Sequence, residues 1–348
     1  MLGDATTPHL VRWGAHFRKR GDTVWIASAQ ESRHADIKLA LPVPWEFAGY
    51  PLLVPVVKRM IRDLKPDLVV AHYLPNYGLI AALSGFRPNV IVAWGSDLLV
   101  LPGRGPFERA RTRLVATRGH AFLVDAQMLV EPLVRFGAPA TNVFVCPFGV
   151  DEDVLAVGRR TERPRDGTPV LLSNRRLEKA YRVDLFLDAL YLATNARRTF
   201  QAVVANTGAE AAALEQAAAR LGLVEAIAWP GLLCRSRYLD SLARADIYVS
   251  TSPSDSTSVS LLEAMAAGLA VVVPDIPGNR EWVRDGECGL LYPAGDARAL
   301  SSAIMALLQD RGRAAAIGQR ARIVVEERGL WSSTIRRAEL LFRQLTSA

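Results

Sequence analysis

Short apolar runs alternate along almost the whole chain with longer stretches in which apolar residues recur every three or four positions. A continuous apolar run is typical of a strand buried on both faces, and the wider spacing is typical of a helix with one buried face. Their alternation predicts parallel sheets covered by helices on both sides, an α/β fold. Because 348 residues exceed the usual size of one core, we expect two doubly wound domains.

The predicted elements can be given by residue number. The first half has strands at 23–28, 68–73, 90–95, 121–125 and 143–149, and helices at 8–20, 52–64, 76–84, 107–118 and 126–136. The second half has strands at 169–173, 201–205, 226–229, 246–251 and 269–273, with helices between them. Helices without strand partners are expected at 297–308, 313–328 and 331–345.

Between Asp151 and Thr168 the chain turns polar and loses its apolar period. We therefore predict the linker here, with domains at 1–152 and 168–328 and a terminal segment at 329–348.

The start of the chain departs from the pattern. Residues 3–8 are typical of a glycine-containing loop and residues 9–20 of a helix, but only Met1 and Leu2 stand before them. A doubly wound domain normally begins with a buried apolar strand at the centre of its sheet. We therefore expect either that the natural chain starts upstream of Met1 or that the first domain has a gap in its sheet.

Composition and charge narrow the function classes. Half of the residues are hydrophobic, 22% are charged and the net charge is +7. The basic excess lies in the first half, around the helices expected at 52–64 and 107–118. These clusters fit either solvated helix faces or attraction to an anionic membrane surface. We expect no nucleic-acid partner, because the clusters lack interleaved aromatic residues and any known binding motif.

Three scattered cysteines, Cys146, Cys234 and Cys288, form no disulfide or metal pattern. The N-terminus has no apolar signal segment. We expect a cytoplasmic protein, with contact at the inner face of the membrane as a further hypothesis.

The stretch from Ser250 to Asp296 carries the clearest chemistry: STSPSDSTSVSLLEAMAAGLAVVVPDIPGNREWVRDGECGLLYPAGD. Asp255 lies in a Ser/Thr-rich loop, and Glu263 follows eight positions later within an expected helix. Three candidate N-cap residues precede that helix, Ser256, Thr257 and Ser258. The N–H groups of a first helical turn suit a phosphate, and carboxylates suit sugar hydroxyls. The stretch predicts a nucleotide-sugar site.

The same stretch resembles the donor-site signature of the family-4 retaining glycosyltransferases (glycosyl transferases group 1). These enzymes have the GT-B fold, two Rossmann-like domains facing a central cleft. The matching elements are Asp255, Glu263, Ala264, Met265, Ala266, Gly268, the strand 270–274, Gly278 with Glu281, and Gly289 to Leu291. The resemblance implies that Asp255 contacts the sugar, that Glu263 binds the ribose, and that Glu281 and the three N-cap residues help to hold the donor. Most members have Glu where this chain has Asp255.

The second domain opens with VLLSNRRLEKAYRVDLFLDA, which resembles the family's diphosphate-binding element. There an Arg and usually a Lys hold the leaving group, and a guanidinium suits this because its planar fork meets two phosphate oxygens. Either Arg175 or Arg176 fits the Arg position. The usual Lys position is Tyr181, and Lys179 is a candidate substitute. Alternatively, these arginines have a structural role and form an ion pair with Glu178 instead of binding phosphate.

Two polar residues follow predicted strand ends in the first domain, His72 and Asp97. Ligands of open α/β sheets bind at the carboxyl ends of the strands. The family builds its acceptor site there, which makes both residues acceptor candidates. Many members have His where this chain has Trp94.

The resemblance implies a transferase that moves a sugar from a nucleotide diphosphate sugar to a hydroxyl of a glycan or lipid-linked acceptor, with retention of configuration and without metal or cofactor.

Asp151-Glu152-Asp153 fits a metal-binding Asp-x-Asp pattern of another glycosyltransferase fold. No further carboxylate cluster accompanies it, so we interpret it as a hinge or helix start. Two alternatives remain open: a catalytically weak nucleotide-sugar-binding partner, favoured by Asp255, Tyr181 and Trp94, and another GT-B enzyme such as a sugar-nucleotide epimerase. In the family the last helix crosses back to the first domain, and Trp331 would mark the crossing.

Overall fold

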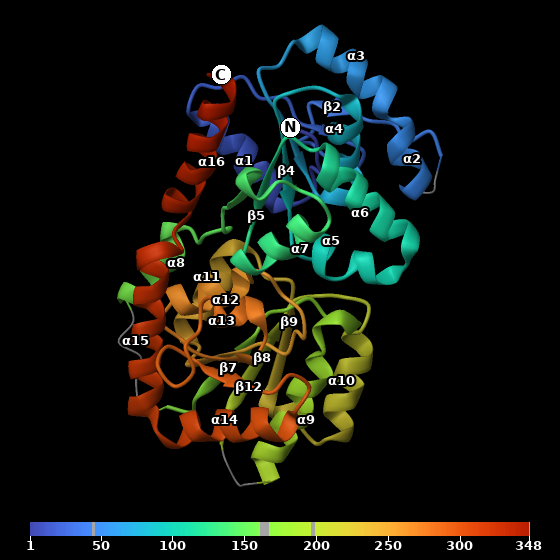
Figure 1. Ribbon diagram of the computed structural model, residues 1–348. Coiled ribbons are helices and arrows are strands. Elements are labelled where there is room, and N and C mark those ends of the chain that lie inside the picture. The colour runs from blue at the N-terminus through green and yellow to red at the C-terminus, as the bar shows by residue number, and fades with distance from the viewer. Residues whose placement is uncertain (44–45, 161–166, 196–198, 348) are drawn as a thin grey trace. The chain divides into compact units, whose positions relative to one another are not determined.

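The computed structural model describes residues 1–348 except 44–45, 161–166, 196–198 and 348 (Figure 1). The described chain divides into two compact units. The first unit comprises Met1–Pro147 together with Arg336–Ala348, and the second comprises Phe148–Ile335. Each unit has its own parallel sheet with helices on both sides, so the predicted α/β class is confirmed.

The sheet of the second unit has the order β12-β11-β10-β7-β8-β9, and all its strands are parallel. The strands are β7 Val170–Ser173, β8 Gln201–Ala205, β9 Ile227–Gly231, β10 Ile247–Val249, β11 Ala270–Pro274 and β12 Leu290–Tyr292. The helices are α8 Glu152–Arg160, α9 Val183–Asn195, α10 Ala211–Arg220, α11 Arg235–Arg244, α12 Val259–Ala266, α13 Pro277–Arg280, α14 Ala297–Gln309, α15 Arg311–Arg328 and α16 Trp331–Thr346. The sequence prediction missed β12.

Successive residues of β11 point into two different cores. Ala270 and Val272 belong to the cluster that includes residues of α9 and α14, whereas Val271 and Val273 belong to the cluster that includes residues of α12 and α15. All four are almost fully buried. Burial on both faces explains why this strand is a continuous apolar run in the sequence.

The polar stretch predicted as a linker begins with a helix. Helix α8 starts at Glu152, and Val154 and Leu155 are buried in the core of the second unit. The linker prediction is therefore wrong for this part: the apolar residues 154–157 anchor a short helix, and the continuously polar stretch begins only after Val157. The rest of the predicted linker, at 161–166, lies outside the described residues.

The first unit contains a four-stranded parallel sheet of order β3-β4-β5-β6 and a two-stranded parallel sheet β1-β2. The strands are β1 Ala27–Ser28, β2 Ile37–Lys38, β3 Val69–His72, β4 Asn89–Ala93, β5 Ala121–Val124 and β6 Val143–Val145. The helices are α1 Pro8–Lys19, α2 Glu46–Leu52, α3 Val54–Leu64, α4 Leu79–Ser84, α5 Ser96–Leu99, α6 Pro106–Arg118 and α7 Val130–Arg135.

The two sheets of the first unit meet through one residue. Leu2 bridges Ala27 of β1 on one side and Ala71 of β3 on the other, both in parallel orientation. The strand predicted at 23–28 is wrong for residues 23–26, which form no strand and precede β1. A strand needs a neighbour along its length, and the position between β1 and β3 holds little more than Leu2.

Helix α16 contributes residues to both units, with the boundary after Ile335. Within the first unit it packs on α1: the rings of Phe342 and Phe17 stack at 5.1 Å, and Glu339 lies 2.6 Å from His16 Nε2. Within the second unit, Trp331 N–H donates to the carbonyl of Val150.

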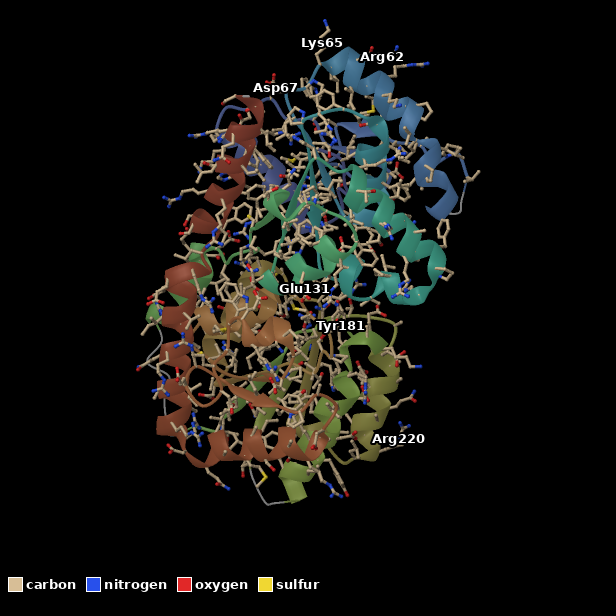
Figure 2. All side chains as sticks on the ribbon, in the orientation of Figure 1. Arg62, Lys65, Asp67, Glu131, Tyr181 and Arg220 are labelled. Atoms are coloured by element: carbon tan, nitrogen blue, oxygen red, sulfur yellow. The ribbon has the colours of Figure 1, made fainter. Side chains whose placement is uncertain are left out.

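The basic residues noted in the sequence are mostly exposed on α3 and α6, and Figure 2 shows Arg62 and Lys65 projecting away from the first unit. Membrane contact through them stays a prediction. Among the described residues, the helices include none whose length and apolar character would let it cross a bilayer.

Two glycines of α15 offer a matched test of close packing. A Cβ on the buried Gly318 would lie 2.2 Å from the carbonyl oxygen of Gly268, whereas one on Gly312 would meet nothing closer than 3.4 Å. Gly318→Ala should lower the free energy of unfolding by about 1–3 kcal/mol through overpacking. Gly312→Ala should leave it unchanged or raise it by up to about 1 kcal/mol. Thermal or urea denaturation checks this, and equal effects of the two substitutions would contradict it.

Candidate donor site in the second unit

The order of strands in the second unit reverses between β7 and β10. From β7 the chain proceeds outward to β8 and β9, and from β10 it proceeds in the opposite direction to β11 and β12. The carboxyl ends of strands at such a switch point form the ligand crevice of an open α/β sheet. Arg175 follows β7, and the loop 250–258 follows β10, so the sheet itself brings these two segments together.

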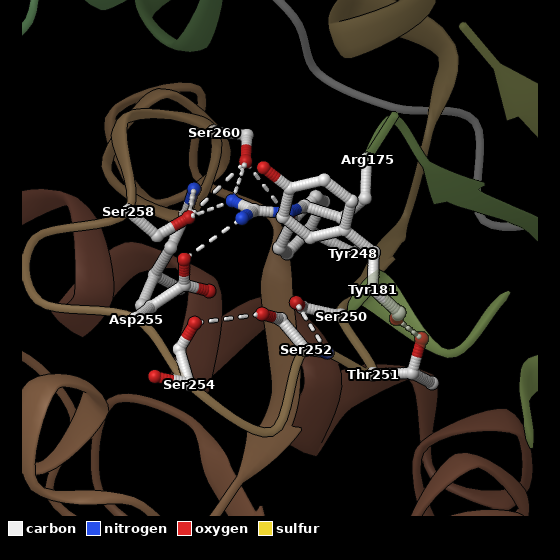
Figure 3. Close-up of polar contacts among 11 residues, drawn as sticks. Arg175, Tyr181, Tyr248, Ser250, Thr251, Ser252, Ser254, Asp255, Ser258 and Ser260 are labelled. Carbon is white, nitrogen blue, oxygen red and sulfur yellow. Dashed lines mark hydrogen bonds and ion pairs between the residues drawn. The ribbon is translucent and has the colours of Figure 1, made fainter. Parts of the chain in front are cut away.

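Arg175 is the centre of the polar contacts at this crevice (Figure 3). Its Nη1 donates to Ser258 Oγ at 2.7 Å and to Ser260 Oγ at 3.1 Å, and its Nη2 donates to Asp255 Oδ1 at 2.8 Å. Ser260 Oγ also accepts from the hydroxyl of the buried Tyr248 at 3.0 Å. One guanidinium thus links the end of β7 to the loop after β10 and to the first turn of α12.

Tyr181 lies against the same guanidinium, with Arg175 Cζ 4.5 Å from the centre of the tyrosine ring. The backbone carbonyl of Tyr181 accepts from Thr251 Oγ1 at 2.8 Å, which ties the aromatic residue to the loop after β10. A cation held over an aromatic face is attracted to it, more strongly when water is excluded. Tyr181 therefore restrains the orientation of Arg175.

The ion pair between Arg175 and Asp255 is largely withdrawn from water, with side chains 11% and 14% exposed. Burial raises the pKa of Asp255, and the charge of Arg175 lowers it only in part. Breaking such a pair from one side leaves a buried charge without its partner, which typically costs about 3–5 kcal/mol.

The three predicted N-cap residues are all buried, and Ser258 is the one that caps α12, since its Oγ accepts from the N–H of Leu261. Helix α13 approaches this loop closely at Gly278. A Cβ there would lie 2.2 Å from the carbonyl oxygen of Asp255 and 2.3 Å from that of Ser256. The glycine of the Gly-x-x-Glu turn is therefore required by contact with the loop that carries Asp255.

Glu263, on α12, is bound by two residues of α11. Arg235 Nη1 donates to its Oε1 at 2.8 Å, and the Tyr238 hydroxyl donates to its Oε2 at 2.8 Å. Burial and the charge of Glu263 raise the pKa of Tyr238, so the hydroxyl keeps its proton. Tyr238 also accepts from Asn174 Nδ2 at 2.7 Å, so the network reaches back to the residue after β7.

Arg235 continues this network to the start of α8. It donates to the two carboxylate oxygens of Asp153 at 3.0 and 2.6 Å and lies 3.8 Å from Asp151. The Asp-x-Asp pattern therefore holds an arginine in the described chain, and its second residue, Glu152, is the first residue of a helix.

The structure separates the two candidate arginines and the candidate lysine. Arg175 is buried at the crevice, while Arg176 is 68% exposed and lies 3.6 Å from Glu178, the predicted structural alternative. Lys179 is exposed on a short 3-10 turn. Glu281 is half-buried at the C-terminal end of α13, where its carbonyl accepts from Arg328.

The two acceptor candidates lie at the carboxyl edge of the sheet in the first unit. His72 ends β3 and is 2% exposed, between the rings of Trp13 and Trp94 at 5.2 and 5.4 Å. Within the described chain neither of its ring nitrogens has a hydrogen-bond partner. Burial, with smaller contributions from the Met1 amine and His9, lowers its pKa to about 3.

Asp97 is fully buried in the first turn of α5 and accepts from the N–H groups of Leu74 and Trp94. It therefore ties the segment after β3 to the end of β4. Burial raises its pKa to about 6 even though backbone donors oppose the shift.

Comparison with known proteins agrees with this architecture. Residues 158–324 match the sequence model described as Glycosyl transferases group 1, and residues 1–125 match Glycosyl transferase 4-like. The chain belongs to the group 1 glycosyltransferase family, whose fold is GT-B.

Individual relatives show how far the similarity extends. The chain is 35% identical over 166 residues to phosphatidyl-myo-inositol mannosyltransferase of Mycobacterium leprae, a match that covers 47% of this chain and 44% of that protein. It is 28% identical over 350 residues to the putative glycosyltransferase EpsD of Bacillus subtilis, covering 88% and 85%. The crystal structure of Anabaena Alr3699/HepE in complex with UDP superimposes with a TM-score of 0.79 at 19% identity, covering 99% of each chain. The mannosyltransferase match thus spans less than half of that relative.

Sequence reasoning missed the residues that hold the candidate site in shape: Asn174, Arg235, Tyr238, Tyr248 and Ser260. Asn174 carried a weak signal, since it directly follows the strand predicted at 169–173, whereas Tyr248 lies inside the strand predicted at 246–251 and carried none. Arg235 and Tyr238 carried none, because a polar first turn is typical of any surface helix.

The raised pKa of Asp97 gives a pH prediction. Because its folded pKa, about 6, exceeds the ordinary 3.8, the contribution of Asp97 to stability should fall as pH rises from about 4 to about 6 and then level off. Asp97→Asn should remove this pH-dependent contribution. The stability of the variant relative to wild type should therefore rise by about 3 kcal/mol between about pH 4 and pH 6. Hydrogen exchange of the β4 amides measures it.

A substitution at His72 should change the pH dependence of stability in the opposite direction. Its lowered pKa makes the contribution of His72 to stability fall as pH drops below about 6.5, so the stability of His72→Gln relative to wild type should rise as pH falls, opposite to the trend for Asp97→Asn. If the relative stabilities of both variants changed with pH in the same direction, the raised pKa of Asp97 and the lowered pKa of His72 would be contradicted.

Proposed function

We propose that this protein is a glycosyltransferase that transfers a sugar from a nucleotide diphosphate sugar to a hydroxyl group of a glycan or lipid-linked acceptor. The observation that carries the proposal is the buried Arg175, held by Asp255, Ser258, Ser260 and Tyr181 at the switch point of the second unit. A buried, oriented guanidinium beside a helix N-terminus suits a diphosphate better than it suits any neutral ligand. Names of relatives support the reaction class: a mannosyltransferase, a putative glycosyltransferase and a neighbour in complex with UDP.

In the proposed mechanism, Arg175 and the first turn of α12 receive the diphosphate, Glu263 the ribose and Asp255 the sugar. The bond between the anomeric carbon and the phosphate oxygen breaks while the acceptor oxygen bonds to that carbon, and the departing phosphate takes the acceptor's proton. Arg175 stabilises the negative charge that develops on the phosphate oxygen, which lowers the barrier. Retention of configuration and independence from metal are part of the proposal and follow from the family resemblance.

A non-catalytic nucleotide-sugar-binding partner is the second candidate. It is favoured by Tyr181 at the usual lysine position and by Trp94 at the usual histidine position. A panel of nucleotide sugars, assayed for nucleoside diphosphate release with and without glycan and lipid acceptors, distinguishes the two. Binding without release under every condition would contradict the enzyme and support the partner.

The two adjacent arginines give a matched pair for testing the phosphate contact. Arg175→Lys keeps a charge but loses the planar fork, and it should lower kcat/KM for the donor by about 10- to 100-fold, since a hydrogen bond to a charged group is worth about 1.5–3 kcal/mol. Arg176→Lys, on the exposed neighbour, should change it by less than about twofold. Steady-state rates with parallel melting curves measure this. A larger loss in the Arg176 variant would reverse the assignment.

Asp255 and Glu263 should respond differently to the sugar-free product. Asp255→Asn should lower turnover while keeping or increasing affinity for the nucleoside diphosphate, because the carboxylate competes with phosphate for Arg175. Glu263→Gln should weaken binding of the diphosphate itself, because the ribose stays in the product. Isothermal calorimetry gives both affinities. A drop in diphosphate affinity for Asp255→Asn that equals the drop in turnover would place Asp255 in a structural cap.

A further inference from the structure

A cavity of about 650 Å³ lies inside the first unit, beside the single bridging residue Leu2. One side is lined by Thr23, Val24 and Trp25, and the opposite side by Asp67, Leu68 and Val69. These are the segments that lead into β1 and β3. The cavity is therefore the space between two chain segments that the sheet holds apart.

The hydrogen bonds of Leu2 fix the register of this space. Leu2 N–H donates to Val70 O and His72 N–H donates to Leu2 O, both at 2.8 Å. On the other side, Ala27 N–H donates to Met1 O at 2.9 Å, and the Met1 nitrogen donates to Trp25 O at 2.5 Å. This is the ladder of a parallel strand between β1 and β3.

Continuing the ladder upstream assigns a partner to each side of the gap. In a parallel arrangement, the position before Met1 lies opposite Trp25 and Val69, and the next lies opposite Val24 and Leu68. A third lies opposite Thr23 and Asp67, and Figure 2 shows Asp67 near the outer edge of the first unit. The register, derived only from the bridges of Leu2, therefore predicts the same residues that line the cavity.

The direction of the backbone groups agrees with this register. Val69 N–H donates to Pro88 O on the β4 side, so the N–H of Val70, one residue later, points into the gap. Ile26 O accepts from Asp36 and Ile37 on the β2 side, so the N–H of Trp25 points into the gap from its opposite edge. The buried Val70 in particular requires a partner for its N–H, which another strand supplies.

Apolar side chains cover both faces of the gap. Val57, Met60, Ile61 and Leu64 of α3 line one side, and Phe17 of α1 and Phe342 of α16 also contribute. The charged lining residues have both signs: Arg20, Lys65 and Arg343 against Asp22 and Asp67, with Arg20 Nε 2.7 Å from Asp22 Oδ2. Backbone donors on two edges and a rim of mixed charge suit a peptide strand better than a fatty acyl chain with an anionic head.

We propose that this cavity is a binding site for one extended apolar peptide segment of about three residues, parallel to β1 and β3 and continuous in register with Leu2. Such a segment completes one continuous sheet from β2 to β6. Because Leu2 O accepts from the N–H of His72, it also steadies the end of β3 that carries the acceptor candidate. The site is independent of the proposed transferase activity.

Extension of the chain by Met-Val-Ile-Val ahead of Met1 tests the proposal, because covalent attachment gives the segment a high effective concentration. The melting temperature of the first unit should rise by roughly 10 °C or more. Two controls have the same length. Met-Ser-Gly-Ser is not apolar, and Met-Val-Pro-Pro is apolar but lacks the N–H groups of the last two positions. Both should raise the melting temperature by less than about a third as much. Equal stabilisation by the proline version would overturn the proposal, because it would show that any apolar segment filling the cavity stabilises the chain without pairing as a strand.

Amide exchange in the unextended chain gives an independent readout. The amides of Trp25 and Val70 should exchange at least about tenfold faster than that of His72, which is already bonded to Leu2, and extension should slow them. Equal protection of Val70 and His72 before extension would overturn the proposal. A second outcome would also overturn the proposal. If a monomeric fatty acid stabilised the unextended chain and the apolar extension had no effect, the cavity would be assigned to an acyl chain.

Discussion

The contact between Arg175 and Asp255 joins the two halves of the sheet in the second unit. The guanidinium comes from the end of β7 and the carboxylate from the loop after β10, so the pair spans the point where the strand order reverses. Ser258, Ser260 and Tyr181 complete the surroundings of the arginine. The cost of burying the two charges is offset by their mutual attraction and by the hydrogen bonds that Arg175 donates to Ser258 and Ser260.

This arrangement also determines how a ligand enters. In the proposed complex, a diphosphate offers Arg175 the same kind of oxygen atoms that Asp255 now supplies, so its binding would exchange one charge-assisted contact for another. Glu263 is in the same situation with Arg235 and Tyr238. The acidic residues of the signature are thus held by neighbouring donors, and in the proposed complex a nucleotide sugar would compete with those donors. This competition makes the diphosphate affinity of the Asp255 variant informative.

Close backbone approach is the second constraint on the fold. Gly278 brings α13 against the loop of Asp255, and Gly318 brings α15 against the turn at Gly268. Both glycines lie where a methyl group would collide with a carbonyl oxygen rather than with a movable side chain. The signature positions of the sequence therefore serve two purposes. Some carry the polar groups of the candidate site, whereas Gly278 is needed because no larger residue fits there.

The sequence by itself determined the α/β class, most strands of the second unit and the segments that carry the candidate site, because buried parallel strands are continuous apolar runs and the donor signature is local. Val170–Ser173 and Gln201–Ala205, for example, lie within one residue of their predicted bounds. Only the tertiary structure showed that Arg175 is buried at the crevice while Arg176 is exposed, since two adjacent residues after a strand point in different directions. It also revealed Arg235 and Tyr238, whose role depends on α11 lying beside α12 and has no local signature. The helix at Glu152–Arg160 was missed for a related reason: its apolar run is short, and its stability comes from contacts with distant residues that the sequence does not show.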